Sequence, residues 1–142
     1  MTRYLPLIIL LLFSGCQENE SIVVQVAGIT VDVELAATPE SRREGLMGRD
    51  SLARNRGMLM VFPQAKELAL WMLNTHIPLD VGFFDTAGVL LNIVSMEPDG
   101  GETIYHSSAS ALYALEMNRG WFERKGIRPG AHLQLPRVIR GR

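Results

Sequence analysis

The chain has 142 residues, a length that suits one domain of ordinary size and leaves little room for a second one. Hydrophobic residues make up 47% and charged residues 20% of it, which excludes an intrinsically disordered protein. The 14 basic side chains are balanced by 15 acidic ones, and no run of Lys or Arg stands beside an aromatic platform. We therefore expect no nucleic-acid partner, because phosphate contacts require clustered positive charge.

The first sixteen residues have the features of an export signal. Met1–Arg3 is a short cationic start, Tyr4–Phe13 is almost wholly apolar, and Ser14, Gly15 and Cys16 are the small residues of a cleavage site. Ten apolar residues are too few to cross a bilayer as a helix, which takes about 20. The segment therefore predicts export and not a membrane span.

Cys16 is the only cysteine, so an intrachain disulfide is excluded. The segment LFSGC resembles the lipobox of bacterial lipoproteins, in which the cysteine becomes the lipidated first residue of the mature chain. Phe13 stands where that motif usually has Leu, and the resemblance implies that Gln17, which is not Asp, allows sorting to the outer membrane. Acyl chains such as palmitate on Cys16 would anchor the domain facing the periplasm, since each buried CH₂ adds about 0.8 kcal/mol of membrane affinity. The alternative is an ordinary secretory signal with a leftover thiol.

The mature chain is predicted to begin with a β-hairpin. Apolar and polar residues alternate from Ile29 to Leu35, which is typical of a strand with one buried face. Ile22–Val26 precedes this segment across the turn Ala27-Gly28, so the two segments predict paired strands.

A short helix is expected next. Thr38 offers a hydroxyl for the N-cap, Pro39 suits the first helical position, and Glu40 places a carboxylate near the positive end of the helix dipole. We expect the helix to run to about Met47 and to stop at Gly48. Because it is short, its stability must come from docking onto the sheet.

The rest of the chain predicts further strands. Gly57–Phe62 is apolar on both faces and should end at Pro63, which cannot donate to a ladder. Glu97–Ser110 contains Pro, Gly, Ser and Asp and predicts a long loop of the kind that is functional or mobile. Asn118–Lys125 should form one or two helical turns closed by Gly126. The other predicted strands are 68–73, 81–84, 89–96, 112–117 and 132–135.

Seven or eight short strands punctuated by Gly and Pro predict a mainly β fold, either a small β-sandwich or a partly closed β-barrel, with one or two short helices. The expected organisation is a lipoprotein signal peptide at 1–15, a lipidated N-terminus and tether at 16–21, a single β-rich domain at 22–136 and a basic tail at 137–142.

No strong catalytic motif is present. The chain has no Gly-rich phosphate loop of the P-loop or dinucleotide type, no HExxH, no CxxC and no GxSxG, and we expect no cofactor. Four side chains are of metal-ligand type, but His76 and Asp80 lie across a proline-containing turn and lack the helical spacing that aligns two ligands. We therefore expect no metal site from His76, Asp80, His106 and Glu116.

Two carboxylates adjoin apolar runs and are candidates for acid/base chemistry. Asp80 and Glu116 could have raised pKa values if apolar surroundings hold them, and a carboxyl of that kind can act as a general acid. The structural alternative is that Asp80 accepts backbone hydrogen bonds at a corner and that Glu116 sits at a strand edge or pairs with an Arg.

The stretch WMLNTHIPLD interrupts an apolar pattern with polar residues and is a candidate recognition surface. Trp71 offers a flat apolar face, Asn74 and Thr75 offer donors and acceptors, and side chains of the following loop could close over them. The alternative is a tight corner in which these side chains satisfy their own backbone. The candidate ligand-binding residues are Trp71, Asn74, Thr75, Asp80, Tyr105 and Ser107.

Four ordered segments resemble a widespread bacterial and archaeal family, domain of unknown function 192. They are REGLMGRDSL at 43–52, GMLMVF at 57–62, LWMLNTHIPLDVGFFD at 70–85 and ALEMNRGWFERKGIRPG at 114–130. Together these motifs are highly specific and span nearly the whole mature chain. The resemblance implies a compact, mainly β fold and no established activity.

Single positions carry the resemblance further. Leu115 and Glu116 fit the later LE pair of the family, and the central motif is matched by Trp71, Met72, Asn74, Thr75, Pro78, Leu79 and Asp80. Two departures stand out. Ala131 replaces an Asp that members often carry in a GD pair, and the segment 97–105 lacks a cysteine found in some members.

The sequence thus favours a binding or interaction module over an enzyme. It predicts an envelope lipoprotein, anchored in the membrane through Cys16, that recognises a small polar or carbohydrate ligand. The alternative is a hydrolase or lyase acting on an envelope carbohydrate, with Asp80 and Glu116 as its acid/base pair.

Overall fold

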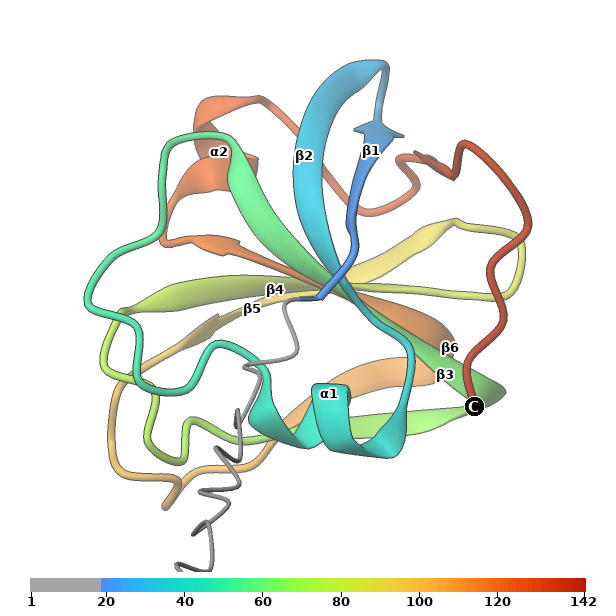
Figure 1. The fold of residues 1–142 in the computed structure, drawn as a ribbon. Helices are drawn as coiled ribbons and strands as arrows, with labels where there is room; N and C mark the ends of the chain where they lie inside the picture. Colours follow the sequence, from blue (N-terminus) through green and yellow to red (C-terminus); the bar gives the residue numbers. More distant parts are fainter. Residues whose placement is uncertain (1–18) are drawn as a thin grey trace, which may run out of the picture.

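Seven strands and two short helices make up residues 19–142, the part of the chain that the computed structural model describes (Figure 1). The predicted signal segment and Cys16 lie outside these residues. The strands are β1 (Ser21–Val26), β2 (Ile29–Ala36), β3 (Arg56–Leu70), β4 (Leu79–Phe84), β5 (Leu90–Met96), β6 (Tyr105–Asn118) and β7 (Leu133–Gln134). The helices are α1 (Pro39–Glu44) and α2 (Trp121–Arg124).

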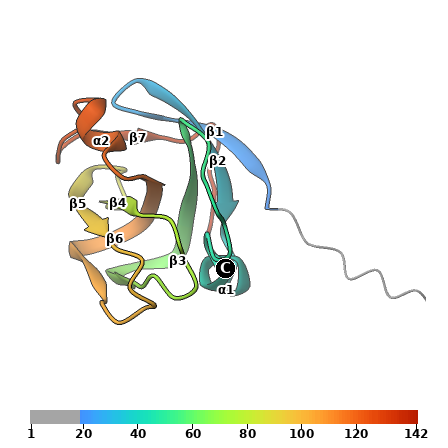
Figure 2. The same ribbon diagram turned by 90° about the vertical axis from the view of Figure 1, so that its left-hand side faces the viewer.

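All seven strands belong to one sheet in the order β5-β4-β6-β3-β2-β1-β7, in which only β2 and β3 pair in parallel. The sheet curls into a half-barrel, so that β1 and β2 stand steeply across β4 and β5 (Figures 1 and 2). The prediction of a mainly β fold with short helices is confirmed, and of the two predicted forms the structure shows the partly closed barrel and not the sandwich.

The curl originates in the long pair β3 and β6, where the register shifts between Val61 and Lys66 and again between Glu67 and Ala69. Pro63 falls inside the first irregularity, where no ladder N–H is required. The expectation that a strand ends at Pro63 is therefore wrong: the strand bends there and continues to Leu70.

Of the other predicted element boundaries, some are confirmed and some are wrong. The hairpin of β1 and β2 is confirmed, with Ala27 and Gly28 both at positive φ in its turn. The N-cap of α1 is confirmed as well, since the Ser41 N–H donates to the Thr38 hydroxyl. The helix ends earlier than expected, at Glu44. The long loop predicted over 97–110 is wrong in its second half, because β6 already begins at Tyr105.

Alternation along the central strands separates two hydrophobic cores. The first core holds Val33, Phe84, Leu115, Met117 and Phe122, among others, and the second holds Met58, Met60, Leu79, Val81 and Phe83, among others. Consecutive residues of β4 and β6 therefore point into different cores. The position of a residue along these strands therefore determines which of the two cores its side chain faces.

Candidate ligand-binding site

A small cavity lies where two loops meet beside β3 and β6. One loop follows α1, and the other is the corner between β3 and β4. The Gly48 N–H joins them by donating a 2.9 Å hydrogen bond to the Asn74 carbonyl. The cavity has a volume of about 80 Å³ and is lined by residues 43–47, Met60, residues 69–71, Thr75 and Glu116. We refer to it as the Glu116 cavity.

Glu116 supplies the buried polar group of this cavity. In β6 it lies opposite Met58 of β3 and Val81 of β4, both of which belong to the second core. Only 4% of the residue is exposed, and its Oε2 has no hydrogen-bond partner among residues 19–142. Burial raises the pKa of the Glu116 carboxyl to about 7. This side chain can therefore exchange a proton near neutral pH.

Trp71 and Thr75 bring the corner residues to the same cavity. Trp71 is 47% exposed, although it directly follows a strand, and it leaves an aromatic face open to solvent. Thr75 is buried, and its hydroxyl donates a 3.2 Å hydrogen bond to the Leu73 carbonyl, so only the lone pairs of its oxygen remain available.

The corner itself is fixed by the backbone. Asn74 adopts a φ of 50°, a left-handed conformation that Asn tolerates, and the Thr75 N–H donates to the Met72 carbonyl at 3.1 Å. The Asn74 side chain does not line the cavity. The predicted tight corner and the predicted recognition surface thus share one stretch of chain, with Asn74 shaping the turn while Trp71 and Thr75 face the cavity.

The last residues of α1 and the loop after it complete the walls, and the charge lies at the end of α1. Exposed Arg43 and Glu44 bring opposite charges to the cavity, and Gly45 adopts a φ of 49°. Further along, the two guanidinium nitrogens of Arg49 donate to the two carboxylate oxygens of Glu34 in β2, at 2.6 and 2.8 Å. These hydrogen bonds hold the pKa of Glu34 below its usual value and anchor the loop to the sheet.

Sequence reasoning missed the contribution of this loop. The segment REGLMG supplies residues 43–47 of the lining, yet its pattern of charges and a terminal glycine indicated only a helix end. The available signal was its place among the four family motifs. Each of those motifs contributes at least one lining residue: Arg43 from the first, Met60 from the second, Trp71 from the third and Glu116 from the fourth.

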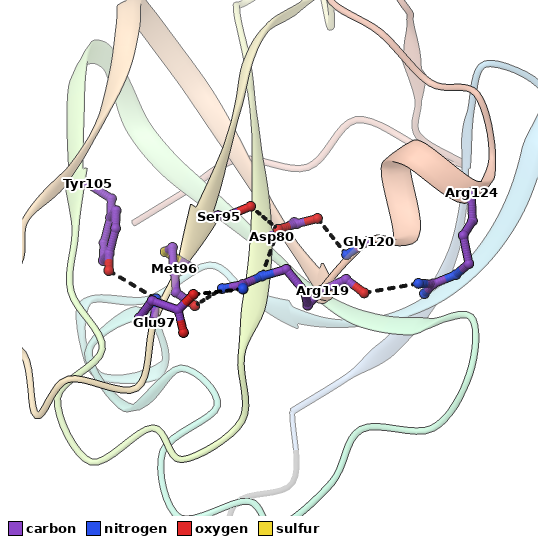
Figure 3. Close-up of polar contacts among 8 residues, drawn as sticks. All are labelled: Asp80, Ser95, Met96, Glu97, Tyr105, Arg119, Gly120 and Arg124. Atoms are coloured by element: carbon purple, nitrogen blue, oxygen red, sulfur yellow. Dashed lines mark hydrogen bonds and ion pairs between the residues drawn. The ribbon is translucent and has the colours of Figure 1, made fainter.

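Asp80 does not line the Glu116 cavity, and both of its carboxylate oxygens accept hydrogen bonds (Figure 3). Its Oδ1 accepts a 2.7 Å hydrogen bond from the Ser95 hydroxyl, and its Oδ2 accepts one of 2.7 Å from the Gly120 N–H. The Arg119 Nε is 3.3 Å from Oδ1, a charge contact without hydrogen-bond alignment. Asp80 therefore ties β4 to β5 and to the turn before α2.

Arg119 extends this network toward the loop after β5 (Figure 3). Its Nη1 is 2.7 Å from Glu97 Oε1, and its Nη2 donates to the Met96 carbonyl at 2.8 Å. The Tyr105 hydroxyl accepts a 3.0 Å hydrogen bond from the Glu97 N–H. Tyr105 is thus held by the loop and does not line the Glu116 cavity.

Ser107 also has a local role. Its hydroxyl accepts the Leu68 N–H at 2.9 Å and donates to the Ala109 carbonyl at 2.7 Å. It satisfies the backbone at the second register shift of β3 and β6, and it does not line the Glu116 cavity.

Asp80 and Glu116 are separated by the sheet. Asp80 pairs with Met117, a residue of the first core, whereas Glu116 pairs with Val81 of the second core. Asp80 borders a different cavity of about 350 Å³, next to Phe122 and Arg128 of the α2 region. The structure therefore does not bring the two carboxyl groups together.

Neither a metal cluster nor a membrane span is found in the described part of the chain. Residues 19–142 contain no group of three or more His, Cys, Asp or Glu side chains placed to hold a metal ion. No helix among them has the length and apolar character needed to traverse a bilayer.

Comparisons with known proteins place the chain in a family. No curated protein gives a significant match. A solved structure from Sinorhizobium meliloti, provisionally assigned as a transcription regulator, is 33% identical, with a TM-score of 0.78 over 85% of this chain and 98% of its own. A protein of unknown function from Novosphingobium aromaticivorans is 30% identical, with a TM-score of 0.79 over 84% of this chain and 88% of its own. Residues 22–135 match the profile of DUF192, described as an uncharacterized ACR. The chain therefore belongs to the DUF192 family.

Proposed function

We propose that this protein is an envelope lipoprotein that binds a small polar ligand in the Glu116 cavity. The lipid anchor on Cys16 would hold the β domain at the periplasmic side of the outer membrane, where such a ligand would reach Trp71 first. The protein then acts by binding and not by turnover.

The observation that carries the proposal is the buried Oε2 of Glu116, which has no hydrogen-bond partner among residues 19–142. Leaving a buried polar group without a hydrogen bond destabilises a fold by about 1 to 3 kcal/mol, and more for a charged group. Buried side-chain polar atoms mostly have partners, so an exception calls for an explanation. A ligand group that enters the cavity and bonds to Glu116 supplies that missing partner.

The cavity has the composition of a recognition site. An aromatic face, a few apolar side chains and a small number of convergent polar atoms are the usual lining of small-molecule sites. Here Trp71 provides the face, Met60 and Leu46 provide apolar walls, and Thr75 and Glu116 provide the polar atoms.

The enzyme alternative has less support. A pair of carboxyl groups in a glycosidase lies in one cleft, with a separation of roughly 5 to 10 Å. Asp80 and Glu116 border different cavities, and both Asp80 oxygens already have partners. A net charge of −1 also offers no electrostatic footprint for nucleic acid, so a role in transcription gains no support from the charge of this chain.

A ligand screen on the full chain, purified in detergent, tests the proposal. The panel contains amines, amides, alcohols and carboxylates of up to about five heavy atoms, because each water-sized group needs roughly 15 Å³ of such a cavity. At least one member should raise the melting temperature and change tryptophan emission, since a ligand that prefers the native state stabilises it.

Two matched variants locate the binding. Ala69 is exposed at the cavity, so Ala69→Leu should narrow the cavity without disturbing either core and should abolish the response. Ala109 is exposed outside the cavity, so Ala109→Leu should leave the response unchanged. The proposal is overturned if no panel member stabilises the protein, or if Ala69→Leu responds like the unmodified chain.

A further inference from the structure

We infer that the group recognised in the Glu116 cavity is a cationic nitrogen, a primary ammonium at the end of a short alkyl chain. This inference rests on the proposed binding function and specifies its ligand chemistry. It follows from the hydrogen-bond capacity, the charge, and the size and walls of the cavity.

The polar side chains deep in the cavity can only accept hydrogen bonds once Glu116 is ionised. The Thr75 hydroxyl has already given its proton to the Leu73 carbonyl. Glu116 Oε2 has no donor among the described residues. Among the described residues that line the cavity, Arg43 is the charged donor, and it is exposed. A complementary ligand must therefore bring donors, and an ammonium group has three of them.

The charge of the ligand follows from the same carboxyl. An ionised carboxylate is unfavourable in this buried position unless an opposite charge stands beside it. An ammonium group within hydrogen-bond distance would provide that charge. Within residues 19–142, the other titratable side chains that line the cavity are Arg43 and Glu44, which carry opposite charges.

Binding is then coupled to proton release. Below neutral pH the Glu116 carboxyl carries a proton in the empty cavity. When the ammonium enters, the carboxyl loses this proton to the solvent, and the carboxylate pairs with the intact ammonium. No covalent bond forms, and one proton leaves for each ligand that binds to the protonated protein.

The cavity walls fit an alkylammonium end better than a sugar ring. A volume of about 80 Å³ has room for roughly five water-sized groups. Met60, Leu46 and Met47 would surround methylene groups, and the exposed face of Trp71 would attract a cation. A free diamine and a lysine side chain both present this chemistry.

Calorimetry with n-propylamine, propionamide and 1-propanol tests the inference at about pH 6. Propylamine should bind at least tenfold more tightly than either neutral probe. Titration in two buffers of different ionisation enthalpy should show release of close to one proton per amine. Comparing 1,4-diaminobutane with Nα-acetyl-lysine amide then distinguishes a free diamine from a lysine side chain.

Variants separate the charge from the cavity. Glu116→Gln keeps the shape of the side chain; it should lower the affinity for propylamine at least tenfold and abolish proton release. Glu102→Gln, at an exposed position, should change neither the affinity nor the proton release. Trp71→Leu should lower the affinity for propylamine severalfold, whereas Trp71→Phe should retain most of the affinity. Trp71 is half-exposed, so neither change should disturb the folded core.

The outcomes distinguish the inference from the proposal beneath it. If propionamide or propanol binds as tightly as propylamine, and Ala69→Leu blocks it, the cavity is a ligand site but not an ammonium site. If Glu116→Gln leaves amine binding intact, the inference also fails. If neither propylamine nor the diamine binds the unmodified protein, the inference fails; if no member of the ligand panel binds either, the proposed function fails with it.

Discussion

At the scale of single residues, two carboxylates of similar sequence context have opposite circumstances. Asp80 is 5% exposed and Glu116 4%. Asp80 has the Ser95 hydroxyl, the Gly120 N–H and the Arg119 charge beside it, whereas Glu116 Oε2 has no hydrogen-bond partner in the part of the chain that the structure describes. A single step in strand register sends them into different environments. Asp80 therefore connects elements of the fold, whereas we propose Glu116 as the ligand-binding group.

The stability of the protein should depend on pH through Glu116. Its pKa is about 7 in the folded state and close to 4.5 in the unfolded chain, so the proton stabilises the folded state. This stabilisation is complete below about pH 4.5, is lost as pH rises to about 7, and amounts to about 3 kcal/mol at roughly 1.4 kcal/mol per pH unit.

The neutral variant Glu116→Gln isolates this effect. Its free energy of unfolding, measured with guanidinium chloride, should exceed that of the unmodified protein by about 3 kcal/mol more at pH 8 than at pH 4.5. Glu102→Gln serves as the control for an exposed site. Parallel pH curves for the unmodified protein and Glu116→Gln would show that the carboxyl titrates normally.

Removal of Asp80 should damage the fold and not ligand binding. Asp80→Ala leaves the Gly120 N–H without its acceptor and removes the carboxylate beside Arg119 Nε, while Arg119 keeps its contact with Glu97. We expect a loss of about 2 to 4 kcal/mol in the free energy of unfolding. Ser95→Ala removes one hydrogen bond and should lose only about 1 kcal/mol. Hydrogen exchange should show faster opening at Gly120 in Asp80→Ala. Unchanged exchange there would contradict the network drawn in Figure 3.

At the scale of elements, the sequence predicted the strands and helix ends that local signals determine. It did not predict those that depend on pairing with a distant segment. The β1–β2 hairpin and the Thr38 cap follow from turn and cap chemistry within a few residues. The continuation of β3 past Pro63 depends on β6, about 50 residues away in the sequence. The register of the two strands shifts at Pro63, so the N–H that proline lacks is not needed there. Pairing with β3 also makes residues 105–110 of the expected loop part of β6. At the register shift there, the Ser107 hydroxyl accepts the Leu68 N–H, a contact that no local sequence pattern indicates.

The docking of α2 depends on a close approach at Gly82 in β4. A Cβ atom there would lie 2.8 Å from Phe122 Cζ and 3.1 Å from Leu90 Cδ1. We expect Gly82→Ala to destabilise the protein by about 1 to 3 kcal/mol through overpacking. Adding Phe122→Leu should recover part of this loss, because it removes the closest atoms. A double variant whose loss equals the sum of the two single losses would contradict the proposed clash.

At the scale of the whole molecule, the half-barrel brings four separated sequence segments to one cavity. The sequence indicated Trp71 and Thr75 as part of one candidate recognition surface, and Glu116 as a candidate acid/base group. It grouped Glu116 with Asp80 and placed Trp71 beside Tyr105 and Ser107, since neither cross-strand register nor the path of the α1 loop can be read from local patterns. The fold class was therefore predictable, while the membership of the site required the topology.

The proposed membrane anchor also concerns the whole molecule. In a Cys16→Ala variant the lipid acceptor is absent, so the protein should move from the membrane fraction to the soluble periplasmic fraction. Fractionation with immunoblotting measures this shift, and Cys16→Ser would be expected to behave in the same way. A variant that still sediments with membranes would contradict the lipoprotein proposal.

The central claim, that the Glu116 carboxyl is the recognition group of a ligand site, is tested most directly by its own titration. The ¹³C chemical shift of the Glu116 carboxyl, followed by NMR against pH with and without n-propylamine, reports its protonation state. We predict a midpoint at about pH 7 in the free protein and a lower midpoint with the amine bound, because a neighbouring cation favours the ionised form. A midpoint near 4.5 that the amine does not move would contradict the account.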